Sequence, residues 1–398
     1  MIRKNAVKIT GFVTVGMLFV VACSSSSPTS VPVQSVSTPT LPTNTLPPPT
    51  ASPLPTASAT EEVIELNPSP RGHVSMAYDS ESKQVILFGG QTGDFNKQDI
   101  PFSGPTMDFA NPGIFSDETW AYDVTTNIWK EMKPPLAPDA GAAGSLVYDV
   151  ESDRVILFGT TRGHSPFVET WAYDFNTNTW TKMVATGPST HLGSNMAYDI
   201  ESDRIILFGG YNHYRDEMYQ DTWTYDFNSD TWTWMKPVTS PPGQNFHSMT
   251  YNIKVDRVIL WGGDTEVDMA RPPKDPSVWA YDFNANTWEQ KKTSDGPSAR
   301  AFSAIAYDTA SDQIILYGGY TIGSHEMWAY DLSKNAWQKL DSSINPGDLS
   351  RHAFSYIPDT DRFILFGGQL GSTHYNYTQS TWVYDFNTNT WTDVTRHP

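Results

Sequence analysis

A short apolar run that ends in glycine recurs six times in the second part of the chain. The six runs occupy residues 85–90, 155–159, 205–210, 258–263, 314–319 and 363–368. Each is rich in β-branched residues and apolar at consecutive positions, which is typical of a strand buried on both faces. The runs follow one another at intervals of roughly 50 residues, the first interval being longer, so the sequence predicts a repeat array.

Each copy carries further markers at fixed places. Tyr-Asp precedes the apolar run in most copies, Trp-x-Tyr-Asp follows it, and a second tryptophan comes nine residues after the first. The alternation in Trp-x-Tyr-Asp has the period of a strand, and Asn, Asp and Ser fill the turns. Each copy is therefore predicted to form four strands, A to D, with the apolar run as strand B. The tryptophan pairs are Trp120 and Trp129, Trp171 and Trp180, Trp223 and Trp232, Trp279 and Trp288, Trp328 and Trp337, and Trp382 and Trp391, twelve of the 14 tryptophans in the chain.

Four strands cannot bury both of their faces alone. Blades stacked around an axis bury each other's flanks and protect the sheet edges. The sequence thus predicts an all-β fold, a six-bladed β-propeller of four-stranded antiparallel blades, over residues 61–398. The order of glycine pair, Trp-x-Tyr-Asp and second Trp resembles the kelch-repeat β-propeller family, whose repeats are about 50 residues long. The resemblance implies a galactose oxidase-like fold.

Three places depart from the repeat, and ring closure stays open. Gly159-Thr160 replaces the glycine pair of the second copy, so its turn is expected to differ. Ile357-Pro358 follows strand A of the sixth copy, and the first copy carries an insertion over about 91–115. Residues 62–66 resemble a strand D ahead of blade 1, although 391–394 already supply one to blade 6. The N-terminal strand is expected either to add to a blade or to compete for it.

The first sixty residues have the pattern of a signal peptide followed by a stalk. Arg3, Lys4 and Lys8 precede an apolar stretch over 11–22, which is short for a membrane span and suits a signal peptide. Val-Val-Ala-Cys23 resembles a bacterial lipobox, which implies lipidation at Cys23. The alternative is an ordinary secretory signal. We predict a lipoprotein signal peptide over 1–22 and a disordered Ser/Thr/Pro-rich stalk over 23–60, which has too few apolar side chains to fold. The chain is then exported and lipid-anchored, facing the extracellular or periplasmic side.

Composition narrows the choice of partners. The formal net charge is −18, with no basic stripe in the repeats, which makes nucleic acid an improbable partner. The single cysteine excludes a disulfide within the chain and a two-cysteine metal site. We expect a monomer that meets the membrane only through its lipid anchor, with an unknown glycan or protein as partner.

All of the variation between copies falls on one rim. The A–B and C–D turns are short and similar, whereas the B–C and D–A connections, which lie on the opposite face of each blade, vary in length and content. Variable loops on a rigid scaffold commonly carry function. Their aromatic and polar residues suit a sugar face or a protein hot spot, with packing onto the propeller as the alternative. The candidate ligand-binding residues are Tyr211, His213, Tyr214, Arg215, Tyr219, Arg271, Arg300, Arg351, His352, His374, Tyr375 and Tyr377.

No cofactor or metal site is expected. Residues 174–178 resemble the start of a calcium loop but lack its later glycine and glutamate, so we interpret them as a repeated turn. His73, His247 and His352 fall near the start of strand A, where they could converge on a ligand or hydrogen-bond the backbone.

Two kinds of kelch enzyme offer an alternative. Copper oxidases of the galactose oxidase type need a cross-linked cysteine, and Cys23 lies in the signal region. Sialic acid mutarotases would need a few Arg or His groups at the channel mouth, for which Arg71, Arg300, Arg351 and His352 are candidates without a linking motif. We therefore assign no catalytic residue and expect a non-catalytic, surface-anchored binding module that recognises a glycan or protein through its B–C and D–A loops. The sugar-modifying enzyme remains the alternative.

Overall fold

The computed structural model describes ten stretches of the chain. They are residues 67–92, 115–139, 144–160, 168–189, 191–212, 215–265, 276–293, 295–320, 325–371 and 376–396. All of them belong to one compact unit, Glu62–Pro398. The regular structure within these stretches consists of strands, and they contain no helix long and apolar enough to cross a membrane.

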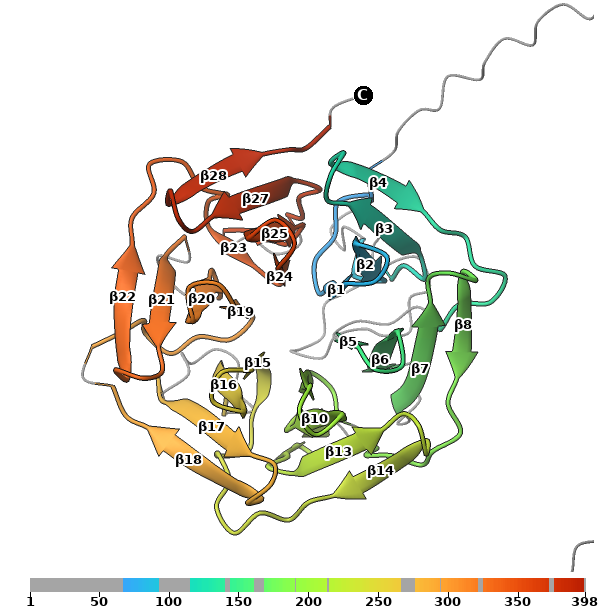
Figure 1. Ribbon diagram of the computed structural model, residues 1–398, viewed down its shortest axis with the longest axis vertical. Helices are drawn as coiled ribbons and strands as arrows, with labels where there is room; N and C mark the ends of the chain where they lie inside the picture. Colours follow the sequence, from blue (N-terminus) through green and yellow to red (C-terminus); the bar gives the residue numbers. More distant parts are fainter. Residues whose placement is uncertain are drawn as a thin grey trace, which may run out of the picture. The chain divides into compact units, whose positions relative to one another are not determined.

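Six four-stranded antiparallel sheets follow one another around a central axis (Figure 1), which confirms the predicted six-bladed propeller. The innermost strands of successive blades contact each other, and β24 contacts β1. Blades 1 to 3 comprise β1 (Ser75–Asp79), β2 (Gln84–Phe88), β3 (Thr119–Asp123), β4 (Ile128–Glu131); β5 (Ser145–Asp149), β6 (Arg154–Thr160), β7 (Val168–Asp174), β8 (Thr179–Lys182); and β9 (Asn195–Asp199), β10 (Arg204–Phe208), β13 (Thr222–Asp226), β14 (Thr231–Trp234). Blades 4 to 6 comprise β15 (Asn245–Asn252), β16 (Arg257–Asp264), β17 (Val278–Asp282), β18 (Thr287–Lys291); β19 (Ala304–Asp308), β20 (Gln313–Tyr317), β21 (Met327–Asp331), β22 (Ala336–Leu340); and β24 (Ala353–Ile357), β25 (Arg362–Phe366), β27 (Thr381–Asp385), β28 (Thr390–Asp393).

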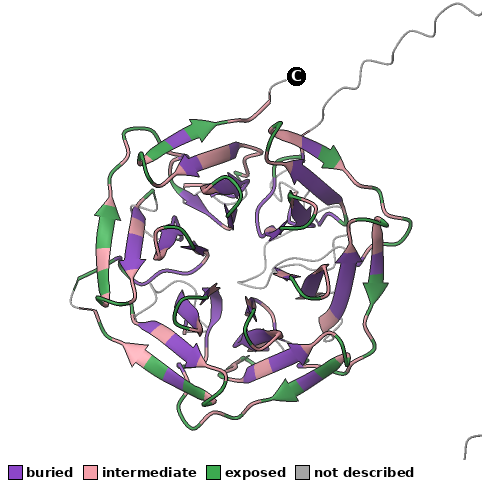
Figure 2. Cartoon of the chain, in the orientation of Figure 1, coloured by how far each residue is buried: buried purple, intermediate pink, exposed green. Residues whose placement is uncertain are grey.

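Two short strand pairs lie outside the blades. β11 (Tyr211–Asn212) pairs with β12 (Glu217–Met218), and β23 (Leu349–Ser350) pairs with β26 (Gln369–Leu370). In each blade the apolar run forms strand B, between strands A and C, and Ile86, Ile156 and Ile206 are completely buried. Figure 2 shows this burial in the inner strands, whereas the outermost strands carry most of the exposed positions.

The A–B and C–D turns repeat one local hydrogen bond. A tyrosine near the end of the first strand donates to an Asp or Asn five residues later, as Tyr173 does to Asn178 Oδ1 at 2.8 Å. The acceptor takes a left-handed conformation, φ being 52° at Asn178, which Asn and Asp tolerate better than most residues. Residues 174–178 thus form a C–D turn. Within the described stretches, no three metal-ligating side chains come together.

The second tryptophan of each blade packs against strand B of the preceding blade. The ring centroids lie 5.0 to 5.7 Å apart, with the planes steeply inclined, an arrangement that aromatic pairs favour. A tyrosine of the tryptophan's own strand C lies on its other side, as Tyr281 does at 4.9 Å from Trp288. The six pairs are Trp129 and Phe366, Trp180 and Phe88, Trp232 and Phe158, Trp288 and Phe208, Trp337 and Trp261, and Trp391 and Tyr317.

Four of these indoles also donate a hydrogen bond across the interface. Trp288 Nε1 donates to Thr222 Oγ1 at 2.9 Å, and Trp129, Trp180 and Trp232 make the same bond to the preceding blade. In the other two interfaces Val278 and Met327 occupy the threonine position, and the indole nitrogens have no partner within the described part of the chain. Ring packing is therefore the contact that all six interfaces share.

The glycine pair after strand B lets adjacent blades approach closely. Gly367 and Gly368 have φ of 67° and 103°. Gly368 N donates to Arg71 O at 2.8 Å, and a Cβ on Gly367 would lie 2.6 Å from that oxygen. In blade 2 the departure predicted at Gly159-Thr160 is confirmed, because β6 continues through Thr160 and pairs it with Val168.

The ring closes between two blades that are each formed from continuous sequence. β28 completes blade 6, and β1 to β4 form blade 1 without a strand from elsewhere in the described residues. Trp129 joins them through its packing on Phe366 and its 2.9 Å hydrogen bond to Thr381. The alternative strand at 62–66 lies outside the described residues.

The glycine pair gives a stability prediction with a matched control. Gly371→Ala introduces a methyl group at φ 65° with nothing within 4 Å, and should lower the free energy of unfolding by about 1–2 kcal/mol. Gly367→Ala has almost the same φ but adds the clash with Arg71 O, and should cost roughly 3 kcal/mol or more. Denaturant unfolding of both variants measures the difference. Equal losses would contradict the close approach.

Candidate functional site

The propeller has two unlike faces. We call the face with the A–B and C–D turns the turn face, and the face with the B–C and D–A connections the loop face. A channel of about 580 Å³, lined by the six inner strands, lies along the central axis. On the turn face the channel mouth is bordered by partly exposed apolar side chains, Val150, Ile200 and Ile253 among them. The loop-face mouth has a different construction.

A belt of backbone hydrogen bonds joins five of the six blades along the loop-face mouth. His73 N donates to Arg351 O, Arg351 N to Phe302 O, Phe302 N to Phe246 O, and Phe246 N to Gly193 O, at 2.8 to 3.0 Å. All five residues have positive φ, between 51° and 69°. The left-handed conformation costs a residue with a side chain about 1–2 kcal/mol, so it persists only where the surroundings impose it. The belt thereby fixes four large side chains at the mouth.

These four side chains, His73, Phe246, Phe302 and Arg351, meet across the axis, and we call them the mouth cluster. The rings of Phe246 and Phe302 stack at 4.2 Å, and His73 lies edge-on to Phe302 at 5.4 Å. The Arg351 guanidinium lies 4.1 Å from the Phe302 ring and donates to Gln369 Oε1 at 2.9 Å. Burial, and secondarily the charge of Arg351, lowers the pKa of His73 well below its ordinary value, so His73 is neutral.

Of the candidate ligand-binding residues, Arg351 alone belongs to the mouth cluster. His352 is buried behind it, edge-on to Tyr317 at 5.6 Å. Arg300 is 1% exposed, and its guanidinium donates to Ser298, Gly318 and Glu326 within blade 5. These contacts favour a structural role for Arg300. Arg71 is arranged in the same way in blade 1, with Glu118 as its carboxylate partner.

The tyrosines of the B–C connections divide into packed and exposed positions. Tyr219 stacks on His191 at 4.0 Å, and its hydroxyl accepts a hydrogen bond from Asn212. Tyr377 donates to Gln91 Oε1 at 2.8 Å and covers Gly72, where a Cβ would lie 2.4 Å from its ring. Packing therefore explains these two. Tyr211, which donates to Asp216, is partly exposed, and Arg215 is exposed.

Some predicted residues lie outside the described part of the chain. These are Cys23, His213, Tyr214, Arg271, His374 and Tyr375. The predictions for them stay predictions.

Sequence reasoning missed the two phenylalanines of the mouth cluster and Tyr320. Phe246 and Phe302 stand six residues before the last residue of the Tyr-Asp or Tyr-Asn pair, as His73 does. That register marks the mouth in the five blades whose residue at this position is described, and it could have found them. Tyr320 directly follows a glycine pair, is 37% exposed and lies 5.4 Å from the Arg351 guanidinium.

Buried histidines give a pH prediction. Burial lowers the pKa of His352 to about 3, against about 6.5 in the unfolded chain. Between these values the unfolded state binds a proton that the native state does not, so stability falls as pH falls from 6.5. His352→Ser, which introduces the residue that blades 3 and 5 carry at this position, should remove part of that loss, up to roughly 1.4 kcal/mol per pH unit. His325→Ser, at a side chain 55% exposed, is the control. Unfolding curves at pH 7 and pH 5 measure both, and parallel slopes for the wild type and His352→Ser would contradict the assignment.

Two family models match the chain. The Attractin/LZTR1 beta-propeller matches residues 58–322, and the KLHDC2/KLHL20/DRC7 Kelch-repeats domain matches residues 250–398. Together they extend over all six blades, and they agree with the repeat order and the ring. The kelch resemblance of the sequence is thereby confirmed, and the chain belongs to the Attractin/LZTR1 beta-propeller family.

Proposed function

We propose that this propeller is a non-catalytic protein-interaction module that recognises its partner through the loop face. Kelch propellers commonly mediate protein interactions, which sets the class of function. The assignment of a face is particular to this chain. It rests on the contrast between a repeated turn face and an individual loop face.

The turn face uses almost the same hydrogen bonds in every blade. The C–D tyrosine bond recurs in all six, and the A–B tyrosine bond in five of them. The B–C and D–A connections of the loop face differ in length and sequence between blades. Tyr320 and Arg351 add a partly exposed aromatic and cationic surface beside the mouth, and such residues are frequent at interface hot spots. This contrast is the observation that carries the proposal.

The alternative of a sugar-modifying enzyme needs Arg and His groups that converge on a pocket. Arg71 and Arg300 instead form ion pairs within their own blades, and His352 is buried between blades. At the mouth, His73 and Arg351 are packed against two phenylalanines. The described residues therefore give this alternative little support.

We further propose that Cys23 anchors the protein to a membrane after export, with 24–60 as a spacer. The sequence context of Cys23 and the composition of the spacer support this proposal. A single acyl chain binds membranes weakly, so stable anchoring would need more than one. Mass spectrometry of the exported protein for a lipid on Cys23 tests it.

The loop-face proposal predicts a difference between two matched variants. Tyr320→Ser removes an aromatic side chain that is 37% exposed on the loop face, and Ile200→Ser removes an apolar one that is 40% exposed on the turn face. On arrays of surface proteins and of glycans, we expect the wild type to retain a protein, Tyr320→Ser to weaken its binding about tenfold, and Ile200→Ser to leave it unchanged. If the array retains only glycans, a glycan is favoured over a protein as the ligand. Loss of binding in Ile200→Ser alone would show that the partner binds the turn face, which contradicts the proposal.

A further inference from the structure

In blade 5, the carboxylate at the start of strand C, Glu326, binds the guanidinium of a buried arginine, Arg300. Glu326 accepts hydrogen bonds from Arg300 Nη2 at 2.9 Å, Lys339 Nζ at 3.0 Å and Trp328 Nε1 at 3.3 Å. Burial raises the pKa of Glu326, but these three donors outweigh it and leave the pKa below its ordinary value. Blade 1 repeats the arrangement with Glu118, Arg71 and Trp120. The carboxylate therefore has a guanidinium partner in two blades.

Blade 2 has the same carboxylate and two of its three donors. Glu169 accepts from Trp171 Nε1 at 2.9 Å and from Lys182 Nζ, which match the Trp328 and Lys339 contacts of Glu326. No described residue of blade 2 supplies the arginine. Arg71 and Arg300 stand eight residues before the Asp that ends strand A, and in blade 2 that sequence position holds Gly141, which lies outside the described residues.

A second position in blade 2 has changed from neutral to acidic. Ser69 and Ser298 accept hydrogen bonds from the arginine of their blade, each through its carbonyl and its hydroxyl oxygen. The corresponding residue of blade 2 is Asp139, which is exposed. Asp139 forms no ion pair with any described residue. Among its described residues, blade 2 thus lacks the arginine that blades 1 and 5 carry, and it has one more carboxylate, Asp139.

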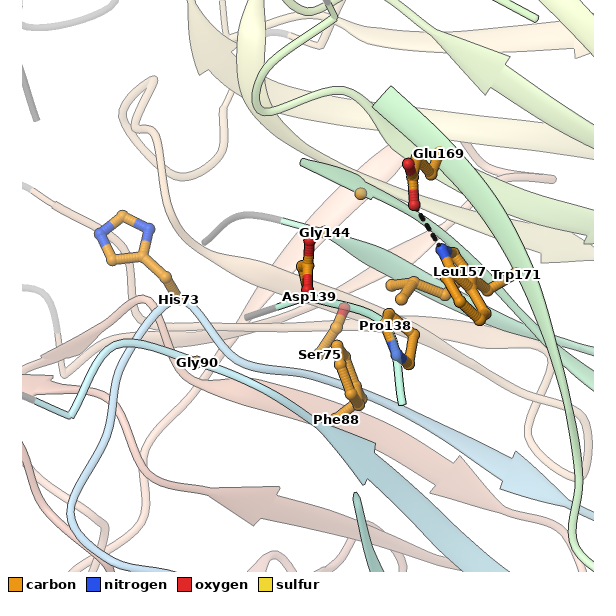
Figure 3. A pocket seen from close by; sticks show the side chains of 11 residues that line it. His73, Ser75, Phe88, Gly90, Pro138, Asp139, Gly144, Leu157, Glu169 and Trp171 are labelled. Carbon is orange, nitrogen blue, oxygen red and sulfur yellow. Dashed lines mark hydrogen bonds between the residues drawn. The ribbon is translucent and has the colours of Figure 1, made fainter. Parts of the chain in front are cut away.

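A small pocket lies between strands of blades 1 and 2 beside these residues. Asp139 and Glu169 both line it, with Gly144 and Trp171 along its wall (Figure 3). Gly159 lines it as well. His73 borders this pocket and also belongs to the mouth cluster, so the pocket lies beside the loop-face mouth. The two glycines carry no side chain that could take the place of the missing arginine.

We propose that this pocket binds the guanidinium group of an arginine side chain presented by the partner protein. The inference rests on the proposed loop-face function and names one contact within it. A guanidinium is a planar fork of donors that suits a carboxylate better than an ammonium does, and it is the group that Glu118 and Glu326 bind inside this chain. The partner's arginine would donate to Glu169 and Asp139, as Arg300 donates to Glu326 and Ser298.

The test uses the full chain and a model of the side chain, N-acetyl-L-arginine methylamide, with the citrulline analogue as a neutral probe of the same shape. Titration followed by NMR should show saturable binding of the arginine probe to the wild type and at least tenfold weaker binding of the citrulline probe. Glu169→Gln and Asp139→Asn should each weaken arginine binding at least tenfold. Glu289→Gln, at a carboxylate 68% exposed on blade 4, should leave it unchanged.

A gain-of-arginine variant gives an independent check. Gly141→Arg places an arginine at the sequence position of Arg71 and Arg300, and should abolish binding of the probe without lowering the melting temperature. No binding to the wild type, equal binding of the citrulline probe, or unchanged binding in Glu169→Gln would overturn the inference.

The experiments distinguish an incorrect pocket assignment from an incorrect assignment of the loop face. If Tyr320→Ser weakens partner binding but the arginine probe does not bind, the pocket assignment alone is wrong. If the partner binds equally well to Tyr320→Ser and to the wild type, the assignment of the binding site to the loop face is wrong, whether or not the arginine probe binds.

Discussion

The structure depends on one aromatic contact, the edge of a strand D tryptophan against the strand B aromatic of the preceding blade. It occurs at all six interfaces, including the one that closes the ring through Trp129 and Phe366. A four-stranded blade leaves one flank of its central strands open, and a large ring from the next blade covers it. Because the contact recurs once per blade, its tryptophan recurs once in each repeat of the sequence.

The same interfaces explain why one face of the propeller is free to vary. The turns of the turn face are specified by local bonds, such as that of Tyr173 to Asn178, which recur from blade to blade. The glycine pairs and the belt of backbone hydrogen bonds fix the start of strand A in the five blades that the belt joins. Between these fixed points the B–C and D–A connections can change in length and charge without disturbing the ring. Blade 2 shows the outcome, since Asp139 and Glu169 border a pocket where blade 5 has a satisfied ion pair.

The fold could be predicted from the sequence because its determinants are local and repeated. Strand B, the Trp-x-Tyr-Asp strand and the turns are each specified by a few adjacent residues. The register within the repeat marks the positions of the mouth cluster, but their conformation could not be predicted in this way, because the left-handed φ of Phe246 and Arg351 is imposed by carbonyl groups of other blades. Arg300 has the residue type of a binding group, and its burial against Glu326 becomes visible only when strands A and C are placed together.

Comparison of two tryptophans tests the central claim most directly. Trp288 packs between Phe208 and Tyr281, whereas Trp234 is 46% exposed on an outer strand of blade 3. In denaturant unfolding, Trp288→Ala should lower the free energy of unfolding by about 3–5 kcal/mol, because it removes a buried ring from between two blades. Trp234→Ala should lower it by less than about 1 kcal/mol. Similar losses in the two variants would contradict the account.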